Sequence, residues 1–280
     1  NYADYITEEY PIGSITEEEI ISSIEEDVSN IIGISRINKI TQTKGEFQAG
    51  ISEKRTLEGR LCLASATSRY QIWKTLDSSP AALYEHVLGT EAAEEKYRIN
   101  SGKSMNTKIP GVVEKLKKDT IPEWGLSEDL KDSGTVPEWI TDFDKFEEQR
   151  KEEIETYKSI LEKSLRLSDY RINSKLKIIE ESYKEHGKPL AFDTSIITLA
   201  FFRKKLEEKL IETHVFSGGD GKSKKKKVEE AEALFGLHSD DTPRIGLLSD
   251  SMSEGINLQG SNVLIHLTYP TTVRKAEQRV

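Results

Sequence analysis

Residues 245–267, IGLLSDSMSEGINLQGSNVLIHL, begin and end with a short apolar run, and a polar stretch separates the two runs. The chain after position 187 contains four such runs: 189–193 (PLAFD), 214–216 (HVF), 245–249 (IGLLS) and 263–267 (VLIHL). Helical patterns over 196–210 and 223–235 alternate with them. This alternation is typical of strands that are buried on both faces of a parallel sheet. We therefore predict an α/β fold with a parallel sheet over 187–280.

The loops that follow these strands are the expected place of function. Ligands of open parallel sheets bind at the carboxyl ends of the strands. Those ends lead into four loops: 193–195, 217–221, 249–255 and 269–272.

The chain before position 187 reads as mainly helical. Helical patterns cover 14–32, 57–95, 144–166 and 173–186. Pro80 interrupts the second pattern and suits the first turn of a new helix. Residues 100–140 lack periodicity and contain three prolines, which predicts an irregular connection. The predicted division is an N-terminal helical segment of unknown role over 1–56, a largely helical region over 57–186 and the sheet region over 187–280.

Composition excludes several classes of protein. A chain of 280 residues with 35% hydrophobic content is large enough for a buried core and for two structural regions. No run approaches the roughly 18 to 20 apolar residues of a membrane helix, and the N-terminus lacks a signal-peptide pattern, so we expect a soluble, cytoplasmic protein. The net charge of −9 argues against binding nucleic acid by bulk positive charge, so any such contact must be local.

Cysteine and histidine usage argues against metal chemistry. Cys62 is the only cysteine, which excludes an intramolecular disulfide and a cysteine-based zinc site. We expect its thiol to be buried and reduced. The five histidines show no pair at metal-ligand spacing, so no metal site made by protein ligands is predicted.

Two Gly-Lys-Ser tripeptides, 102–104 and 221–223, resemble the end of a phosphate-binding P-loop. A P-loop requires a glycine five residues before the second glycine, and those positions hold Tyr97 and Phe216. The chain also has no Asp-Glu dipeptide, the second element usual in such ATPases. The parts that hold ATP and Mg²⁺ are therefore absent from this sequence.

A specific resemblance begins in the segment 247–260, LLSDSMSEGINLQG. Its Ser-Glu-Gly-x-Asn-x-Gln core, 253–259, matches motif V of Swi/Snf-type superfamily-two helicases, and Glu-Gln-Arg-Val at 277–280 matches the opening of motif VI. The chain resembles the C-terminal RecA-like lobe of this family, closest to the bacterial HepA/RapA-like branch. The sequence ends before the arginines that follow in motif VI.

Three further segments are similar to the family. Residues 190–195 (LAFDTS) resemble its motif IV strand, 216–219 (FSGG) its next strand-to-glycine turn, and 73–82 a helical segment between its two lobes. Two departures affect the middle of the lobe: Asp193 replaces a polar or aromatic residue, and lysines replace an arginine after Gly219.

The resemblance implies the second motor lobe of an ATP-dependent double-stranded DNA translocase. Such a lobe closes on a first RecA-like lobe, which holds most of the ATP and Mg²⁺, and it is inactive alone. The implied site residues fall in three groups. Gln278 and Arg279 would stabilise transition-state charge. Glu254, Gly255 and Asn257 would face the nucleotide. The implied phosphate-backbone contacts are Thr194, Ser195, Ser217, Gly218 and Ser249.

Other interpretations stay open. Each of these serines and threonines is at least as common as a turn or cap residue. The chain could be an ATPase-dead interaction module whose working part, 1–186, binds other proteins, or part of an RNA-directed motor. A Rossmann-like nucleotide domain is less favoured, because no Gly-x-Gly-x-x-Gly follows a strand.

Overall fold

The computed structural model describes residues 15–37, 53–118, 126–127, 131, 134, 136–218, 221–252 and 256–268. The chain divides into two compact units. The first, the sheet unit, comprises 1–19, Tyr97–Gly102 and Leu167–Val280. The second, the helical unit, comprises Ile20–Lys96 and Lys103–Arg166.

The sheet unit is built on four parallel strands: β1 (Leu190–Asp193), β2 (Thr213–Phe216), β3 (Ile245–Ser249) and β4 (Leu264–His266). Their order is β2-β3-β1-β4, so β2 and β4 lie at the edges. The register pairs Phe192 with Leu248, and Leu248 with Phe216. All four predicted strands are present, and the predicted α/β fold with a parallel sheet is confirmed.

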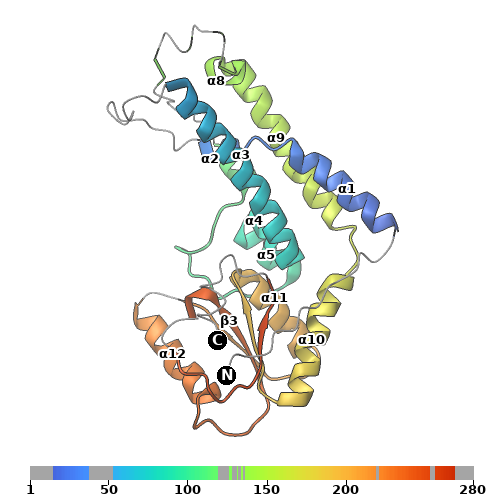
Figure 1. Cartoon of the computed structure of the whole chain (residues 1–280), viewed down its shortest axis with the longest axis vertical. Helices are drawn as coiled ribbons and strands as arrows, with labels where there is room; N and C mark the ends of the chain where they lie inside the picture. The colour runs from blue at the N-terminus through green and yellow to red at the C-terminus, as the bar shows by residue number, and fades with distance from the viewer. Residues whose placement is uncertain are drawn as a thin grey trace. The chain divides into compact units, whose positions relative to one another are not determined.

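Three helices accompany the strands: α10 (Tyr170–His186), α11 (Ile196–Glu207) and α12 (Gly221–Phe235). The connection through α11 runs from β1 to the edge strand β2, and the connection through α12 runs back to β3 (Figure 1). Right-handed crossovers in opposite directions place their helices on opposite faces of the sheet. The sheet unit resumes at Leu167 and therefore includes α10. From the sequence, the start of the lobe was predicted at 187.

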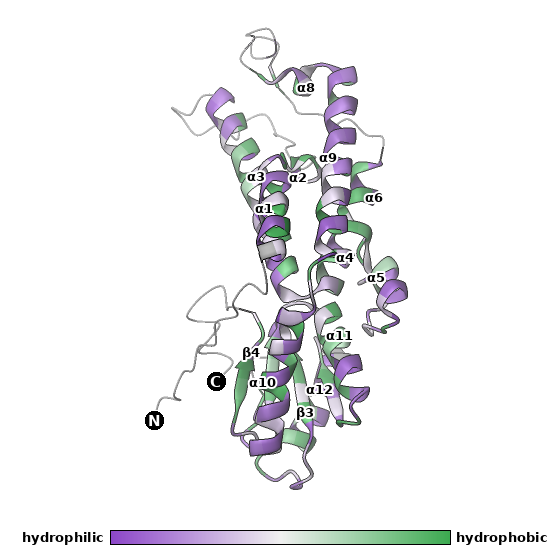
Figure 2. Ribbon diagram, turned by 90° about the vertical axis from the view of Figure 1, so that its right-hand side faces the viewer, coloured by the Kyte–Doolittle hydropathy of each residue, from purple (hydrophilic) through white to green (hydrophobic). Residues whose placement is uncertain are grey.

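Strand residues alternate between the two faces. The α12 face holds one apolar cluster: Leu190, Phe192, Phe216, Ala231, Phe235, Leu248 and Met252. Phe216 and Phe235 meet edge to face, with ring centroids 6.0 Å apart. Figure 2 shows the strands as the hydrophobic part of this unit. This packing fixes the strand ends from which the functional loops leave.

The helical unit contains most of α1 (Ile15–Ser29) and seven further helices among the described residues: α2 (Ile34–Ile37), α3 (Glu53–Ser78), α4 (Pro80–Leu88), α5 (Thr90–Tyr97), α6 (Val112–Leu116), α8 (Glu138–Thr141) and α9 (Phe143–Ser164). The predicted break at Pro80 is confirmed, because Ser79 caps α4 by accepting a hydrogen bond from the Ala82 N–H at 3.1 Å. Within the predicted irregular stretch 100–140, α6 is a short helix. No helix among the described residues is long and apolar enough to cross a membrane.

Two predictions for the region around α3 were wrong. The helix predicted from position 57 begins four residues earlier, at Glu53, and 38–52 lie outside the described residues. Cys62 is exposed rather than buried. The reason is the position of the buried face, which carries Leu57, Ala64, Ser68 and Ile72. Cys62 precedes Ala64 by two residues, and two residues turn an α-helix by more than half a circle.

Candidate nucleic-acid interface

A cluster of hydroxyl groups lies where β2 and β3 end. The Ser249 and Ser251 hydroxyl oxygens are 2.7 Å apart, and the Gly218 N–H donates to Ser251 Oγ at 2.7 Å. The same N–H lies 3.4 Å from Ser249 Oγ. Three of the five residues that the sequence assigned to phosphate contacts, Ser217, Gly218 and Ser249, therefore come together at one edge of the sheet.

Exposure distinguishes two layers within this cluster. Ser249 is 3% exposed and Ser217 is 7% exposed, so both lie almost entirely below the surface. Ser251 is exposed and Gly218 is half-buried. In this arrangement Ser249 orients Ser251, and Ser251 is the hydroxyl that can meet a ligand. The sequence analysis did not single out Ser251.

Lys227 adds a positive charge to the cluster. Its ammonium group reaches back from α12 and donates to the carbonyl oxygen of Ser217 at 3.0 Å and to its hydroxyl at 3.1 Å. Lys227 is only half-exposed, whereas Lys225 and Lys226 are exposed. The sequence does not distinguish these lysines from one another. In the structure, Lys227 differs from them by its hydrogen bonds to Ser217.

Gly218 is required by close packing. A Cβ at this position would lie 2.6 Å from the Ser251 Cβ, which is far inside normal contact. The close approach brings the Gly218 N–H within hydrogen-bond distance of Ser251. A substitution here would therefore separate the β2 loop from the β3 loop.

The loop after β1 caps a helix. Ser195 is the N-cap of α11 and accepts a hydrogen bond from the Thr198 N–H at 3.4 Å. Its own N–H donates to the fully buried Asp193 carboxylate at 2.7 Å. Thr194 is half-buried between them. The structure thus gives Ser195 a local role, which the sequence had left open as the alternative to a phosphate contact.

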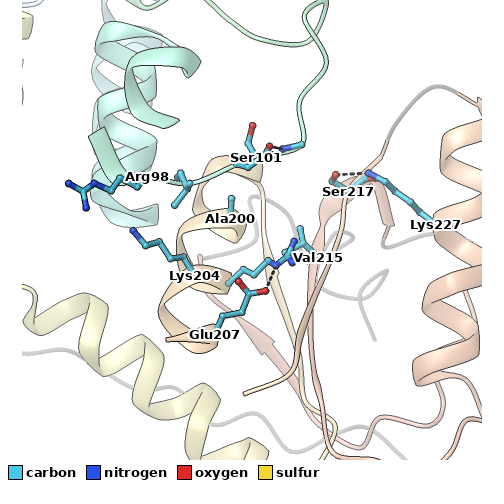
Figure 3. A pocket seen from close by; sticks show the side chains of 12 residues that line it. Arg98, Ser101, Ala200, Lys204, Glu207, Val215, Ser217 and Lys227 are labelled. Carbon is cyan, nitrogen blue, oxygen red and sulfur yellow. Dashed lines mark hydrogen bonds and ion pairs between the residues drawn. The ribbon is translucent and has the colours of Figure 1, made fainter. Parts of the chain in front are cut away.

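A cavity of about 430 Å³ opens beside the end of β2. Its lining residues come from 97–102, α11, β2 and α12, and they include Arg98, Ser101, Ala200, Arg203, Lys204, Glu207, Val215, Ser217 and Lys227. Figure 3 shows Lys227 directed at Ser217 from α12, with α11 and the segment around Ser101 on the other side. Val215 and Ser217 point to the face of the sheet that carries α11, as strand alternation requires.

The motif V residue Asn257 lies elsewhere. Its N–H donates to the Glu232 carboxylate at 3.1 Å, near the C-terminal end of α12. Its Oδ1 accepts a weak hydrogen bond from the Gln259 N–H at 3.3 Å. Glu232 lies five residues beyond Lys227, which corresponds to about 7.5 Å along α12, and no hydrogen bond of the hydroxyl cluster involves Asn257. Asn257 is therefore not part of the hydroxyl cluster. Glu254, Gly255, Gln278 and Arg279 lie outside the described residues.

Potential metal-ligating side chains are scattered through the described residues. Nowhere in this part of the chain do three His, Cys, Asp or Glu side chains gather where they could hold a metal ion. Lys103 of the first Gly-Lys-Ser tripeptide is ion-paired with Glu85 at 2.6 Å, and both side chains are nearly buried. This lysine forms a nearly buried ion pair within the helical unit.

Known proteins give no independent guide to function. Family models, curated proteins and solved structures were all compared with this chain, and none of them matches. The sequence motifs and the geometry at the edge of the sheet are therefore the features that indicate a function.

Proposed function

We propose that the sheet unit is the second motor lobe of an ATP-dependent double-stranded DNA translocase and that it grips the phosphate backbone at the ends of β2 and β3. The convergence of Ser217, Gly218, Ser249, Ser251 and Lys227 supports this proposal most directly. Ser251 and Lys227 are the outer groups, and the other three hold them in place.

The chemistry of this cluster suits a phosphodiester. Proteins bind DNA phosphates largely through lysine and arginine, short hydroxyl side chains and backbone N–H groups, without reading the base sequence. Such contacts need a local positive charge rather than a basic protein, so a net charge of −9 is compatible with DNA binding. The cluster offers a phosphate the Lys227 ammonium group and the Ser251 hydroxyl, and the buried hydroxyls of Ser217 and Ser249 support these two groups.

The role in the ATP cycle follows from the sequence resemblance. We assign ATP and Mg²⁺ mainly to a first RecA-like lobe, as the resemblance implies. Closure of the two lobes would move the DNA contacts relative to that lobe and so advance the strand. The proposed location is the cytoplasm.

The first test measures DNA binding by the 280-residue chain. Fluorescence anisotropy with a labelled 20-base-pair duplex compares the unmodified chain with Ser251→Ala and Ser249→Ala. The half-buried Ser174 on α10, outside the cluster, supplies the control Ser174→Ala. We expect both cluster variants to weaken binding and the control to leave it unchanged.

A second test concerns the motor activity. A polypeptide in which this chain is joined to its first lobe should hydrolyse ATP faster with double-stranded DNA, and Gln278→Ala should abolish the stimulation. Stimulation by RNA alone would favour the RNA-directed motor. Absence of hydrolysis with every nucleic acid would reject the motor proposal.

One observation favours protein interaction as a second candidate function. Leu63 and Tyr70 are 67% and 52% exposed, and a spacing of seven residues places them on the same side of α3. Exposed apolar side chains on one helix face are a common feature of protein contacts. Replacing both with serine should leave DNA binding intact if this face serves another protein.

A further inference from the structure

Helix α3 presents an exposed apolar stripe. Gly59, Leu63, Ala66 and Tyr70 are all exposed, and Leu63 and Tyr70 keep 67% and 52% of their surface accessible to solvent. Spacings of four, three and four residues place these four residues on one side of the helix. The residues that α3 buries lie on the opposite side. We call the four exposed residues the α3 stripe.

Helix α9 of the same unit shows what an ordinary solvent-facing side contains. Every exposed residue of α9 between Asp144 and Glu162 is an aspartate, a glutamate or a lysine. On α3, by contrast, no exposed residue between Gly59 and Leu76 is charged. Helices normally turn their charged residues to solvent and their apolar residues to a partner. The α3 stripe therefore has the composition of a contact surface.

Gly59 is not explained by packing within the chain. It lies inside α3, and no atom is found within 4 Å of the position that its Cβ would occupy. Glycine inside a helix is less favourable than alanine, because it loses more conformational freedom on folding. A partner that approaches the helix backbone closely would account for a glycine at this exposed position.

Cations flank the stripe. Residues 59–76 include Arg60, Arg69 and Lys74 and no acidic residue, in a chain with a net charge of −9. Helix geometry places Arg60 and Lys74 on one side of the stripe and Arg69 on the other. Arg69 Nε donates to the Ile31 carbonyl oxygen at 3.2 Å, and within the described part of the chain none of the three cations pairs with a carboxylate. These three positive charges fit an acidic partner.

Charge also distinguishes a second copy of this chain from another protein. Pairing two α3 stripes would bring two sets of cations together, and like charges at a contact are unfavourable. Carboxylates on a partner would be attracted instead. The spacing of the stripe is that of the a and d positions at which two helices interlock, and Gly59 and Ala66 leave room there for larger side chains. An acidic helix is therefore the favoured partner.

We propose that the α3 stripe binds an acidic amphipathic helix of another protein, with the apolar side chains of that helix over Gly59 and Ala66 and its carboxylates near the three flanking cations. This inference rests on the second candidate function, contact with another protein, and names the class of partner. The recognition would use one apolar helix face laid along another. It is independent of the DNA contact in the sheet unit.

The probe is a fluorescein-labelled peptide of three heptads, with leucine at positions a and d and glutamate at e and g. Repulsion among the glutamates keeps this peptide from pairing with itself. A matched peptide carries lysine in place of glutamate. We expect the 280-residue chain to raise the anisotropy of the glutamate peptide and to bind the lysine peptide about tenfold more weakly. Equal binding of both peptides, or binding of neither, would overturn the inference.

Gly59→Ala separates a binding role from a structural one. The added methyl group lies where a side chain of the peptide would pack, so the affinity for the glutamate peptide should fall about tenfold. The unfolding temperature should stay the same or rise, because alanine favours a helix more than glycine does. A glycine that served only the fold would leave peptide binding unchanged, and this result would contradict the proposal.

Arg60→Gln tests the contribution of charge. Removal of one flanking cation should weaken binding of the glutamate peptide about threefold. Lys151→Gln is the matched control, because it removes the same charge from an exposed position on α9, and it should leave peptide binding unchanged. If Arg60→Gln weakens binding of the labelled duplex but not of the peptide, this face contacts DNA and the inference is wrong.

The thiol of Cys62 reports where the peptide lies. Cys62 is exposed and directly precedes Leu63 of the stripe. The docked glutamate peptide should slow the reaction of this thiol with a maleimide several-fold. Replacing both Leu63 and Tyr70 with serine should abolish this protection. Peptide binding that leaves the thiol reaction unchanged would place the peptide elsewhere on the chain and reject the stripe as its site.

The DNA and peptide assays can fail separately. A chain that binds the duplex but not the glutamate peptide retains the proposed DNA contact and loses this inference. A chain that binds the peptide at the stripe but not the duplex retains this inference and loses the DNA contact. If sedimentation shows a dimer that the double serine variant breaks, a second copy covers the stripe and the acidic helix is the wrong partner.

Discussion

The two units place their polar groups in opposite ways. In the helical unit the Glu153 side chain is 3% exposed, and its carboxylate accepts hydrogen bonds from the Gly33 and Ile34 N–H groups at 3.1 to 3.3 Å. This carboxylate satisfies the first turn of α2 and joins it to α9. In the sheet unit, Ser251 and Lys227 are held at or near the surface by buried neighbours. The Glu153 carboxylate bonds to buried backbone and stabilises the fold. The Ser251 hydroxyl, by contrast, is exposed at the edge of the sheet and can reach a ligand.

The largest expected effect concerns pH and the helical unit. Burial raises the pKa of Glu153 from 4.5 to about 7, although hydrogen bonds from the backbone N–H groups of Ile34, Gly33 and Ile32 favour its charged form. Burial, together with Arg36 and Lys115, lowers the pKa of His86 from 6.5 to about 4. The folded state therefore holds an extra proton on Glu153 between pH 4.5 and 7, and it lacks one on His86 between pH 4 and 6.5. Glu153 makes the free energy of unfolding fall as the pH rises, whereas His86 makes it rise, so the two contributions nearly cancel.

Single substitutions should reveal the pH dependence of the unfolding free energy that each residue causes. With Glu153→Gln, the free energy of unfolding should fall as the pH drops from 6.5 to 4, because only His86 remains. With His86→Leu, it should fall as the pH rises from 4.5 to 7, because only Glu153 remains. Each change is on the order of 3 kcal/mol across its window. Urea unfolding followed by tryptophan fluorescence measures this unit selectively, since all three tryptophans, 73, 124 and 139, belong to it. Parallel slopes in the two variants would contradict the assignment.

A glycine in each unit gives the next comparison. A Cβ at Gly111 would lie 2.5 Å from the Leu88 Cα, and backbone cannot move aside as a side chain can. We expect Gly111→Ala to destabilise the helical unit by about 2 kcal/mol and to leave DNA binding unchanged.

Gly218→Ala should show the reverse pattern. Its clash is with the Ser251 side chain, which can shift, so the loss of stability should be about 1 kcal/mol or less. The shift breaks the Gly218–Ser251 hydrogen bond, so affinity for the duplex should decrease about threefold in the anisotropy assay. An equal loss of stability in both glycine variants, with no change in affinity, would remove the distinction between the units.

The smallest expected effects concern two helix caps. Ser79 and Ser195 both accept hydrogen bonds at the N-terminus of a helix, at 3.1 and 3.4 Å. Ser79→Ala should cost about 1 kcal/mol, and Ser195→Ala should cost less because its bond is longer. Thermal unfolding ranks the two losses. A decrease in DNA affinity in Ser195→Ala alone would show that this serine also meets phosphate.

The strands of the sheet unit could be predicted, most clearly the two central strands β1 and β3, whose residues are all buried. Strands such as β3, all five of whose residues are buried, produce apolar runs that stand out from polar loops. The strand order β2-β3-β1-β4 is not encoded in such runs, because it depends on which strands pair after the helices cross. The exposure of Cys62 was not predicted, because cysteine is among the residue types most often buried. Only the position of Cys62 relative to the buried face of α3 shows that its thiol is exposed.

The candidate site was predicted in part. The loops after β2 and β3 were expected to hold it, because chain topology brings strand ends together. Ser251 and Lys227 were not singled out, because their importance depends on contacts between segments that are far apart in sequence.

The exposed Cys62 makes the chain a single-thiol protein. A maleimide dye will therefore attach at one known point on α3, with no need to remove other cysteines first. Paired with a second dye on a DNA end, this fluorophore gives an energy-transfer signal whose changes report the approach of the helical unit to the duplex. Distance measurements on this protein therefore need no engineered cysteine.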